Sequence, residues 1–330
     1  MSKIIADRVE RIDVFIANVL NDSRSKVANL IKNNNILVNN RTVKTSYKLN
    51  ICDEIIINLP KLQETNIRYE VNFNVEIIYE DDDILVINKP IRIATHGASS
   101  LKEASLVEWL LDNNYKLADI NGRIRAGIVH RLDKETSGVM IVAKTNKAYL
   151  NLASQIKDRL VDRIYIAVTN LRVNCENIEK YIKRNENNRL KMQSLSEDEC
   201  IKKYGMNKDR WGKWAKTHFI NLCTKENINL LAAKLESGRT HQIRTHLASI
   251  NRFILGDNIY ADSKNKIASN RLMLHSFFIN FNHPISGKNL CFIAKFDNEF
   301  EKYLNNFENI CLDYEFAIKL LNDFNKNILK

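Results

Sequence analysis

The stretch AGIVHRLDKETSGVMIVAKT, residues 126–145, places a charged cluster between two apolar runs, GIV and VMIVA. The cluster consists of His130, Arg131, Asp133, Lys134 and Glu135. Charged groups at the mouth of buried strands are held rigidly and are partly removed from water, as functional groups are. A surface turn with ion pairs has the same charge pattern, so charge alone leaves both interpretations open. The run VMIVA predicts a buried strand directly after the cluster.

Further β-rich runs lie on both sides of this stretch. They are VEIIYED, DILVINKP, RIYIAVTN, THFINLCT, NLLAAKLE, HSFFINFNHP and CFIAKF. Helical segments such as SLVEWLLDNN (105–114) and KAYLNLASQIKDRL (147–160) separate some of them. Because strands and helices do not alternate regularly, the pattern argues against a doubly wound fold. It predicts an α+β domain with a mixed, mainly antiparallel sheet and flanking helices.

A second polar cluster lies in KLESGRTHQIRTHLAS, residues 234–249, after the strand-like run NLLAAKLE. It contains Arg239, Thr240, His241, Gln242, Arg244 and His246. The two histidines do not have the i, i+4 spacing of a helical zinc pair, so we expect no metal here. Two guanidinium groups and several other donors at one turn suit phosphate recognition and the fixing of a carboxylate.

The first 60 residues predict a separate small unit with two helices and short strands. The helices fall in RVERIDVFIANVL (8–20) and SRSKVANLIKNN (23–34). Val27, Leu30 and Ile31 form one apolar stripe on the second helix. Asn39 and Asn40 predict a tight turn between two strands.

The start of the second helix predicts a phosphate contact. Ser23 is a suitable N-cap, and positive side chains would meet free backbone N–H groups there. The residues expected to contact RNA at this helix start are Ser23, Arg24, Ser25 and Lys26.

The stretch SRSKVANLIKNNNILVNNRTVKTSYKLNICDEIII resembles the S4 RNA-binding domain, with Asn40 where glycine is usual. A generic cap of two helices and a hairpin is the alternative. We expect an S4-like RNA-binding domain over residues 1–60, a polar linker over 61–74 and a catalytic domain over 75–330.

The chain carries 50 Lys and Arg against 39 Asp and Glu, a net charge of +11 over 330 residues. Part of the excess is local, because residues 201–250 hold ten basic and three acidic side chains. A local surplus suits a groove for a polyanion, since Lys and Arg contacts release counterions from phosphates. A generally basic protein is the alternative.

The six cysteines are dispersed, without CxxC or Cys/His spacing, so reduced thiols are expected. Charged residues within MSKIIADRVERIDVFIANVL argue against a signal peptide. No uncharged apolar run approaches the roughly 20 residues that a bilayer requires. The sequence therefore predicts a cytoplasmic protein without a membrane segment.

The two polar clusters together resemble the RluA-type pseudouridine synthases over nearly the whole chain. HRLDKETSGVMIVAKT is similar to the family's catalytic motif, with Asp133 at its essential aspartate. DRIYIAV places Tyr165 at the tyrosine that contacts the target base. GRTHQIRTHLA places Arg244 at the arginine that pairs with the aspartate. YEDDDILVINKP, which ends in Lys89 and Pro90, resembles the opening motif.

Some positions depart from the family pattern. Arg163 stands where lysine is usual, Asn170 replaces a glycine, and Arg92 and Gly97 stand where glycine and proline are frequent. These changes affect substrate geometry more than chemistry. The chain resembles the RluD-type subgroup in its S4-like segment, in the spacing of its motifs and in its HPISG ending. This resemblance implies 23S large-subunit ribosomal RNA as the substrate.

The resemblance implies isomerisation of uridine to pseudouridine, which needs no cofactor, metal or energy donor. It implies that Asp133 is the nucleophile, that Arg244 keeps it charged and oriented, and that Tyr165 covers a flipped base. Expected RNA contacts in this domain are Arg131, Lys89, Arg239, Thr240, His241 and Gln242. We expect a monomer that binds structured RNA.

Several alternatives stay open at this stage. The target could be transfer RNA, and the route could pass through attack on C1′, attack on C6 or a glycal. A non-catalytic RNA-binding ribosome-assembly protein would use Asp133 only in a structural ion pair. A glycosidic-bond hydrolase usually requires two catalytic carboxylates, and Asp133 has no convincing partner in the sequence.

Overall fold

The chain divides into two compact units, Met1–Ile67 and Arg68–Lys330. The computed structural model describes residues 2–20, 24–58, 69–97, 101–120, 122–261, 269–307 and 310–328. Most of the expected linker 61–74 lies outside these ranges, as do Ser23 and the side chains of Ser25 and Lys26.

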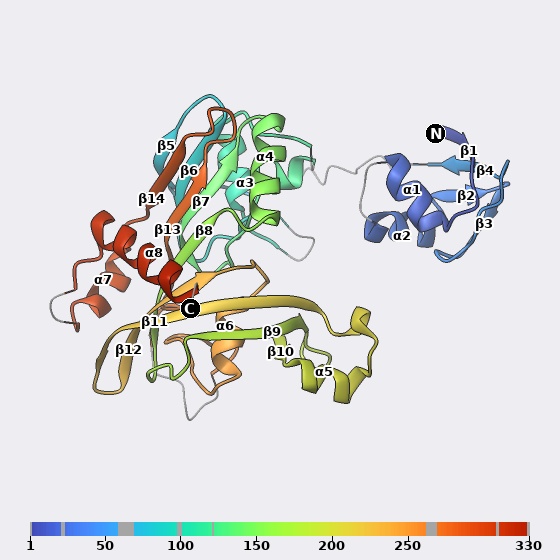
Figure 1. The fold of residues 1–330 in the computed structure, drawn as a ribbon. Coiled ribbons are helices and arrows are strands. Elements are labelled where there is room, and N and C mark those ends of the chain that lie inside the picture. The colour runs from blue at the N-terminus through green and yellow to red at the C-terminus, as the bar shows by residue number, and fades with distance from the viewer. Residues whose placement is uncertain are drawn as a thin grey trace. The chain divides into compact units, whose positions relative to one another are not determined.

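The first unit is a small four-stranded antiparallel sheet with two helices (Figure 1). Its elements are β1 Ser2–Ile5, α1 Ile12–Leu20, α2 Arg24–Lys32, β2 Ile36–Val38, β3 Arg41–Thr42 and β4 Glu54–Ile57. The sheet order is β1-β4-β2-β3. Val27, Leu30 and Ile31 are buried, which confirms the predicted stripe on the second helix. Asn39 and Asn40 have φ of 48° and 62° between β2 and β3, as the predicted tight hairpin turn requires.

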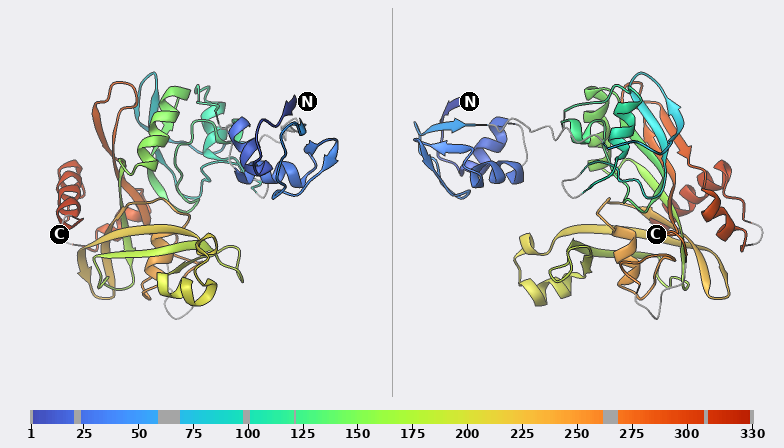
Figure 2. Two further views of the ribbon diagram at one scale, coloured as in Figure 1. Left: turned by 45° about the vertical axis from the view of Figure 1, so that its right-hand side comes forward. Right: turned by 180° about the vertical axis from the view of Figure 1, so that it is seen from behind.

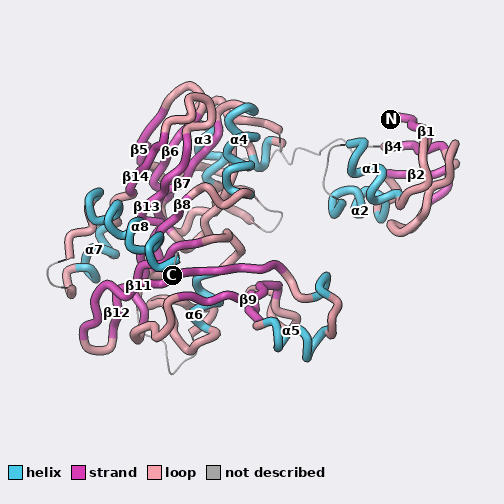
Figure 3. Tube along the Cα trace, viewed as in Figure 1, coloured by secondary structure: helices cyan, strands magenta, loops and turns pink. Residues whose placement is uncertain are grey.

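The second unit is built on a ten-stranded sheet with the order β10-β9-β11-β12-β8-β13-β7-β6-β5, and β14 pairs with β13 (Figure 3). The strands are β5 Glu76–Glu80, β6 Ile84–Lys89, β7 Ser137–Ala143, β8 Asp162–Thr169, β9 Asn177–Arg184, β10 Met192–Leu195, β11 Lys213–Lys225, β12 Ile228–Leu235, β13 Leu274–Asn282 and β14 Asn289–Ile293. The β7–β13 pair is parallel and the other described pairs are antiparallel. The expected mixed, mainly antiparallel sheet is confirmed.

Helices flank the sheet of the second unit, as Figure 2 also shows from two other sides. They are α3 Leu106–Asp112, α4 Asn146–Lys157, α5 Glu197–Tyr204, α6 Gln242–Ala248, α7 Asn298–Leu304 and α8 Tyr314–Ile328, with short 3-10 turns η1 Arg123–Arg125 and η2 Lys208–Arg210. Thr145 caps α4 by accepting from the backbone N–H of Ala148, and α4 packs against β7. The C-terminal helix α8 contacts β14.

Strand β13 is the junction of the sheet. Tyr165 on β8 lies opposite Ser276, and Ser137 on β7 lies opposite His275. Gly138 has φ +118°, and a Cβ there would lie 2.2 Å from the Ser276 carbonyl oxygen. The glycine of the TSG sequence therefore allows β7 to approach β13 directly after the charged loop. This approach brings the loop that carries Asp133 beside the strand that carries Tyr165.

Candidate active site

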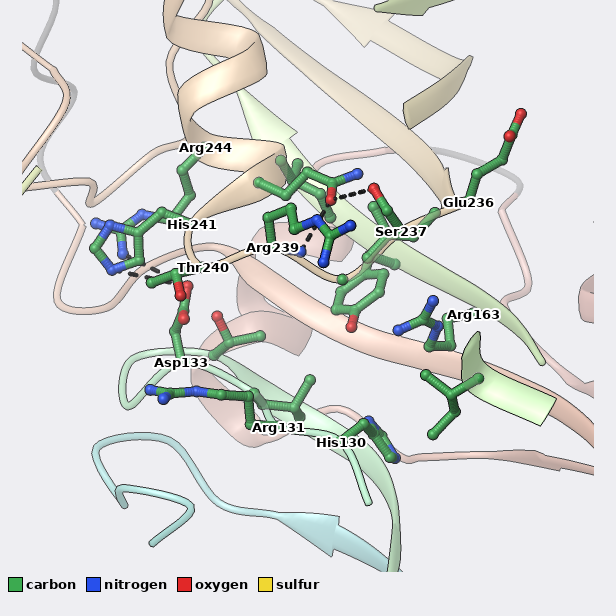
Figure 4. A pocket seen from close by; sticks show the side chains of 18 of the residues that line it. His130, Arg131, Asp133, Arg163, Glu236, Ser237, Arg239, Thr240, His241 and Arg244 are labelled. Carbon is green, nitrogen blue, oxygen red and sulfur yellow. Dashed lines mark hydrogen bonds and ion pairs between the residues drawn. The ribbon is translucent and has the colours of Figure 1, made fainter. Parts of the chain in front are cut away.

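A pocket of about 550 Å³ lies where three segments of the second unit meet. The loop before β7 contributes Asp133, β8 contributes Tyr165, and the turn between β12 and α6 leads to Arg244. The three residues expected to be catalytic therefore line one pocket. Figure 4 shows Asp133, His241 and Arg244 together on one side of it, and Arg163 with Glu236 on the other.

Asp133 faces two nitrogen groups. Arg244 Nη1 and His241 Nε2 each lie 3.9 Å from its Oδ2 atom. Oδ1 has no hydrogen-bond partner among the described residues. The carboxylate is therefore oriented through one oxygen, while the other is available to a substrate.

The main partner of Arg244 is Asp257, which the sequence did not single out. Arg244 Nε and Nη2 each donate a hydrogen bond of 2.8 Å to Asp257, and both side chains are buried. Burial acts to raise the pKa of Asp257, but the hydrogen bonds and charge of Arg244 outweigh it, and the pKa is lowered. The expected pairing of Arg244 with Asp133 is present as an ion pair of 3.9 Å, and the closer, bidentate contact of Arg244 is to Asp257.

Asp257 is itself held by the backbone. Its Oδ1 atom accepts from the N–H groups of Ile259 and Tyr260 at 2.9 and 3.0 Å. Asp257 lies in the segment GDNIYADS, directly after Gly256. A carboxylate that accepts four hydrogen bonds is fixed, so it holds the guanidinium plane in one orientation.

His241 is oriented by Tyr260. The Met192 N–H donates to the Tyr260 hydroxyl oxygen at 2.8 Å, and that hydroxyl lies 3.0 Å from His241 Nδ1. Burial raises the pKa of Tyr260 to about 12, so it stays a phenol whose proton needs an acceptor. Donation to Nδ1 leaves the ring proton on Nε2, which faces Asp133. Burial also lowers the pKa of His241, which favours the neutral ring.

Tyr165 is 6% exposed and lies on β8 in the wall of the pocket. Burial raises the pKa of Tyr165, and Ser276 is its hydrogen-bond neighbour on β13. The phenol is thus a neutral, largely apolar face within the pocket.

Two residues expected to contact RNA have other roles. Lys89 is fully buried, and its Nζ donates to the carbonyl oxygens of Pro90, Ile93 and Lys134 at 2.7, 2.8 and 3.4 Å. Burial lowers the pKa of Lys89 to about 7. The RNA contact expected of Lys89 is therefore wrong, because the ammonium lies inside the protein and ties the loop after β6 to the loop that carries Asp133.

The RNA contact expected of Gln242 is also wrong. This side chain is buried, and its Oε1 atom accepts from Ser237 Oγ and the Arg239 N–H at 2.8 and 3.0 Å. Its Nε2 atom donates to the Lys216 carbonyl and Thr217 Oγ1, each at 3.0 Å. All four hydrogen-bonding positions of the side-chain amide are therefore occupied by contacts that hold the turn before α6.

The remaining expected contacts are placed as follows. Arg131 is exposed, Thr240 is half-buried, and both line the pocket with Arg239. Arg24 in the first unit donates to the buried carboxylate of Asp13 at 2.8 Å. Among the described residues, no group of three or more His, Cys, Asp or Glu side chains is arranged to hold a metal ion. No described helix combines the length and apolar character needed to cross a bilayer.

Residues 83–249 match the family described as RNA pseudouridylate synthase. The chain belongs to this family. Residues 10–55 match the S4 domain. The protein is therefore an RNA pseudouridine synthase, an isomerase, with an N-terminal S4 domain.

Curated relatives agree with this assignment, and a solved structure shares the fold. An uncharacterized RNA pseudouridine synthase of Helicobacter pylori is 41% identical over 303 residues, 89% of each chain. The ribosomal large subunit pseudouridine synthase D of Neisseria meningitidis serogroup B is 34% identical over 301 residues, 88% of this chain and 76% of that one. Human RNA pseudouridylate synthase domain containing 1 has a similar fold, with a TM-score of 0.54 and 19% identity over 74% of this chain and 98% of that one.

Proposed function

We propose that this synthase modifies large-subunit ribosomal RNA, with Asp133 as its nucleophile and with the target uridine flipped into the pocket. The observation that carries the catalytic part is the position of Asp133, with Oδ2 facing Arg244 and His241 and Oδ1 unengaged. The relatives named ribosomal large subunit pseudouridine synthase D support the choice of RNA.

The proposed chemistry uses the Asp133 carboxylate as the nucleophile. An ionised carboxylate attacks C1′ of the ribose or C6 of the base, the N1–C1′ bond breaks, and the uracil turns. C5 then bonds to C1′, the bond between the carboxylate and the substrate breaks, and C5 loses its proton while N1 gains one. Atoms and electrons therefore balance without a redox partner. Arg244 Nη1 and His241 Nε2, each 3.9 Å from Oδ2, orient the carboxylate toward the substrate.

A uridine stacked in a helix cannot reach the Asp133 carboxylate, so the base must leave the stack, at a cost of a few kcal/mol. The pocket of about 550 Å³ has the size of small-molecule sites and is large enough for one nucleotide. Tyr165 provides the face that covers the base. Arg131, Arg239, Thr240 and His241 are the groups that contact the RNA around it.

The first unit serves as the RNA-binding domain. We assign residues 1–60 to it, 61–74 to the connection and 75–330 to the catalytic domain. The helix start with Ser23, Arg24, Ser25 and Lys26 would contact the phosphates. The protein acts as a monomer in the cytoplasm, where ribosomal RNA is modified.

The test is to map pseudouridine by selective chemical labelling in total RNA from cells with and without this protein. Marks lost from large-subunit ribosomal RNA and restored by the wild type support the proposal. If marks are lost only from transfer RNA, transfer RNA is the substrate instead of ribosomal RNA. If the marks are unchanged and RNA binding is intact, the protein is better explained as a ribosome-assembly protein.

A further inference from the structure

Arg163 is a buried guanidinium to which the described residues offer no hydrogen-bond or ion-pair partner. It lies on β8, is 4% exposed and lines the pocket. Its Nε atom has no hydrogen-bond partner, and Arg163 forms no ion pair within the described residues, although the charge of Asp162 acts to raise its pKa. Burial is the main cause that lowers the pKa of Arg163. Since a buried charge is costly unless it is paired, this group is prepared for a ligand that brings the missing acceptors.

The protein leaves room for this guanidinium. A Cβ atom at Gly238 would lie 2.7 Å from Arg163 Nη1, so the backbone of the turn before α6 packs directly over the side chain. Any other residue at position 238 would displace the guanidinium. Arg163 and Tyr165 are two residues apart on β8 and both line the pocket, so they share one face of the strand.

Two more guanidinium groups gather at this end of the pocket. Arg159 lies over the ring of Trp214 at 4.3 Å, and Arg239 Nε donates to the Trp214 carbonyl at 3.1 Å. The charge of Arg239 contributes to the lowered pKa of Arg163, and Arg159 does the same to Arg239. The charge of Arg239 therefore repels both Arg163 and Arg159.

The one carboxylate among the described residues that line this end is Glu236, and it is already engaged. Its Oε1 atom lies 2.7 Å from His218 Nε2 and 3.7 Å from Lys216 Nζ, and its Oε2 atom lies 3.4 Å from Arg159. Glu236 does not pair with Arg163. Figure 4 places Arg163 across the pocket from Asp133, so this positive end is separate from the carboxylate proposed to react.

We propose that Arg163, with Arg159 and Arg239, binds a phosphate of the RNA backbone next to the target nucleotide. A planar guanidinium with free N–H groups matches two phosphate oxygens. A neutral uracil carbonyl would accept a hydrogen bond but would not offset the repulsion between Arg163 and Arg239, so the phosphate fits better. The contact fixes the strand while the base enters the other end of the pocket, and it helps to offset the cost of flipping. This inference rests on the proposed function.

The test is the salt dependence of RNA binding by the full chain, measured by filter binding with a large-subunit ribosomal RNA fragment and with transfer RNA. Loss of one phosphate contact in Arg163→Met should reduce the slope of log K against log salt by about 0.7 to 0.9. It should weaken binding about tenfold at low salt, as loss of a charge-assisted hydrogen bond does. Arg163→Lys should keep most of the slope, and Arg172→Met, an exposed arginine outside the pocket, is the matched control.

The outcomes are distinct. A reduced slope in Arg163→Met but not in Arg163→Lys supports the phosphate site. An unchanged slope with weaker binding would show that Arg163 contacts a base carbonyl and not a phosphate. Unchanged binding would show that Arg163 takes no part in RNA recognition. Either result overturns the proposal. If Arg163→Met does not fold, Arg163→Gln is measured instead. The assay needs no turnover, so an error about Asp133 or about the modified RNA would not be mistaken for an error about Arg163.

Discussion

Arg244 donates two hydrogen bonds of 2.8 Å to Asp257. The same guanidinium points Nη1 toward Asp133 at 3.9 Å. Asp257 also accepts hydrogen bonds from two backbone N–H groups, so its carboxylate is held in place and fixes the orientation of Arg244. The orientation of the proposed nucleophile thus depends on a residue that does not face the substrate.

Replacing Asp257 should weaken both the fold and the reaction. Asp257→Ala leaves the guanidinium of Arg244 buried without its bidentate partner, which costs roughly 3 to 5 kcal/mol. Urea unfolding measures the stability and a single-turnover assay measures the rate, with exposed Asp82→Asn as the control. A stable, fully active Asp257→Ala variant would show that the pair does not position Arg244.

Arg244→Lys tests geometry apart from charge. Lysine keeps the positive charge but cannot contact Asp257 through two parallel donors and still face Asp133. We expect the single-turnover rate at saturating RNA to fall on the order of 100-fold, with RNA affinity within about twofold of the wild type, as for an interaction made mainly in the transition state. A normal rate with weaker binding would instead place Arg244 in ground-state recognition.

Tyr260→Phe tests the orientation of His241. The change removes the hydroxyl that contacts both His241 Nδ1 and the Met192 N–H. We expect kcat to fall about tenfold, because a hydrogen bond of this kind is worth around 1 kcal/mol and the unpaired N–H adds to it. His241→Gln, which retains a donor near the Nε2 position, should be more active than His241→Asn, which does not. Equal activity of the two variants would contradict the donor role.

Lys89 predicts a pH dependence of stability. Its folded pKa of about 7 lies below the ordinary value of 10.5. Between these values the unfolded chain binds more protons, so the free energy of unfolding rises with pH. From pH 6.5 to 8.5 the wild type should gain about 2 kcal/mol relative to Lys89→Met, which lacks this titration. Denaturant unfolding of both proteins at the two pH values measures the difference, and parallel pH profiles would contradict the burial of a charged lysine.

The sequence predicted those features that depend on local pattern. The stripe of Val27, Leu30 and Ile31 follows helical spacing, and the two asparagines at 39 and 40 suit positive φ. The β-rich runs were strongly apolar, so the strands of the central sheet were recognisable. The loop that carries Asp133 was identified because charges interrupt two apolar runs.

Other features depend on tertiary contacts that no local pattern records. Lys89 ends an apolar run before a proline, where a lysine usually reaches solvent, yet three carbonyl groups enclose it. The seven-residue helix α6 is too short for a clear period, so its residues were interpreted as a turn. Strands β9 and β10 and helix α5 were missed because their exposed faces are polar. Asp257 does not stand in a cluster of charged residues in the sequence, so the pattern did not indicate it. Its role follows only from its contact with Arg244.

The most direct test of the central claim compares Asp133→Asn with the wild type and with Asp82→Asn. Each purified protein is incubated with large-subunit ribosomal RNA from cells that lack the enzyme, and pseudouridine and bound RNA are both measured. We predict no product with Asp133→Asn, RNA affinity within about twofold of the wild type because the carboxylate makes no phosphate contact, and normal product with Asp82→Asn. Product formed by Asp133→Asn at a rate near that of the wild type would remove Asp133 from the reaction.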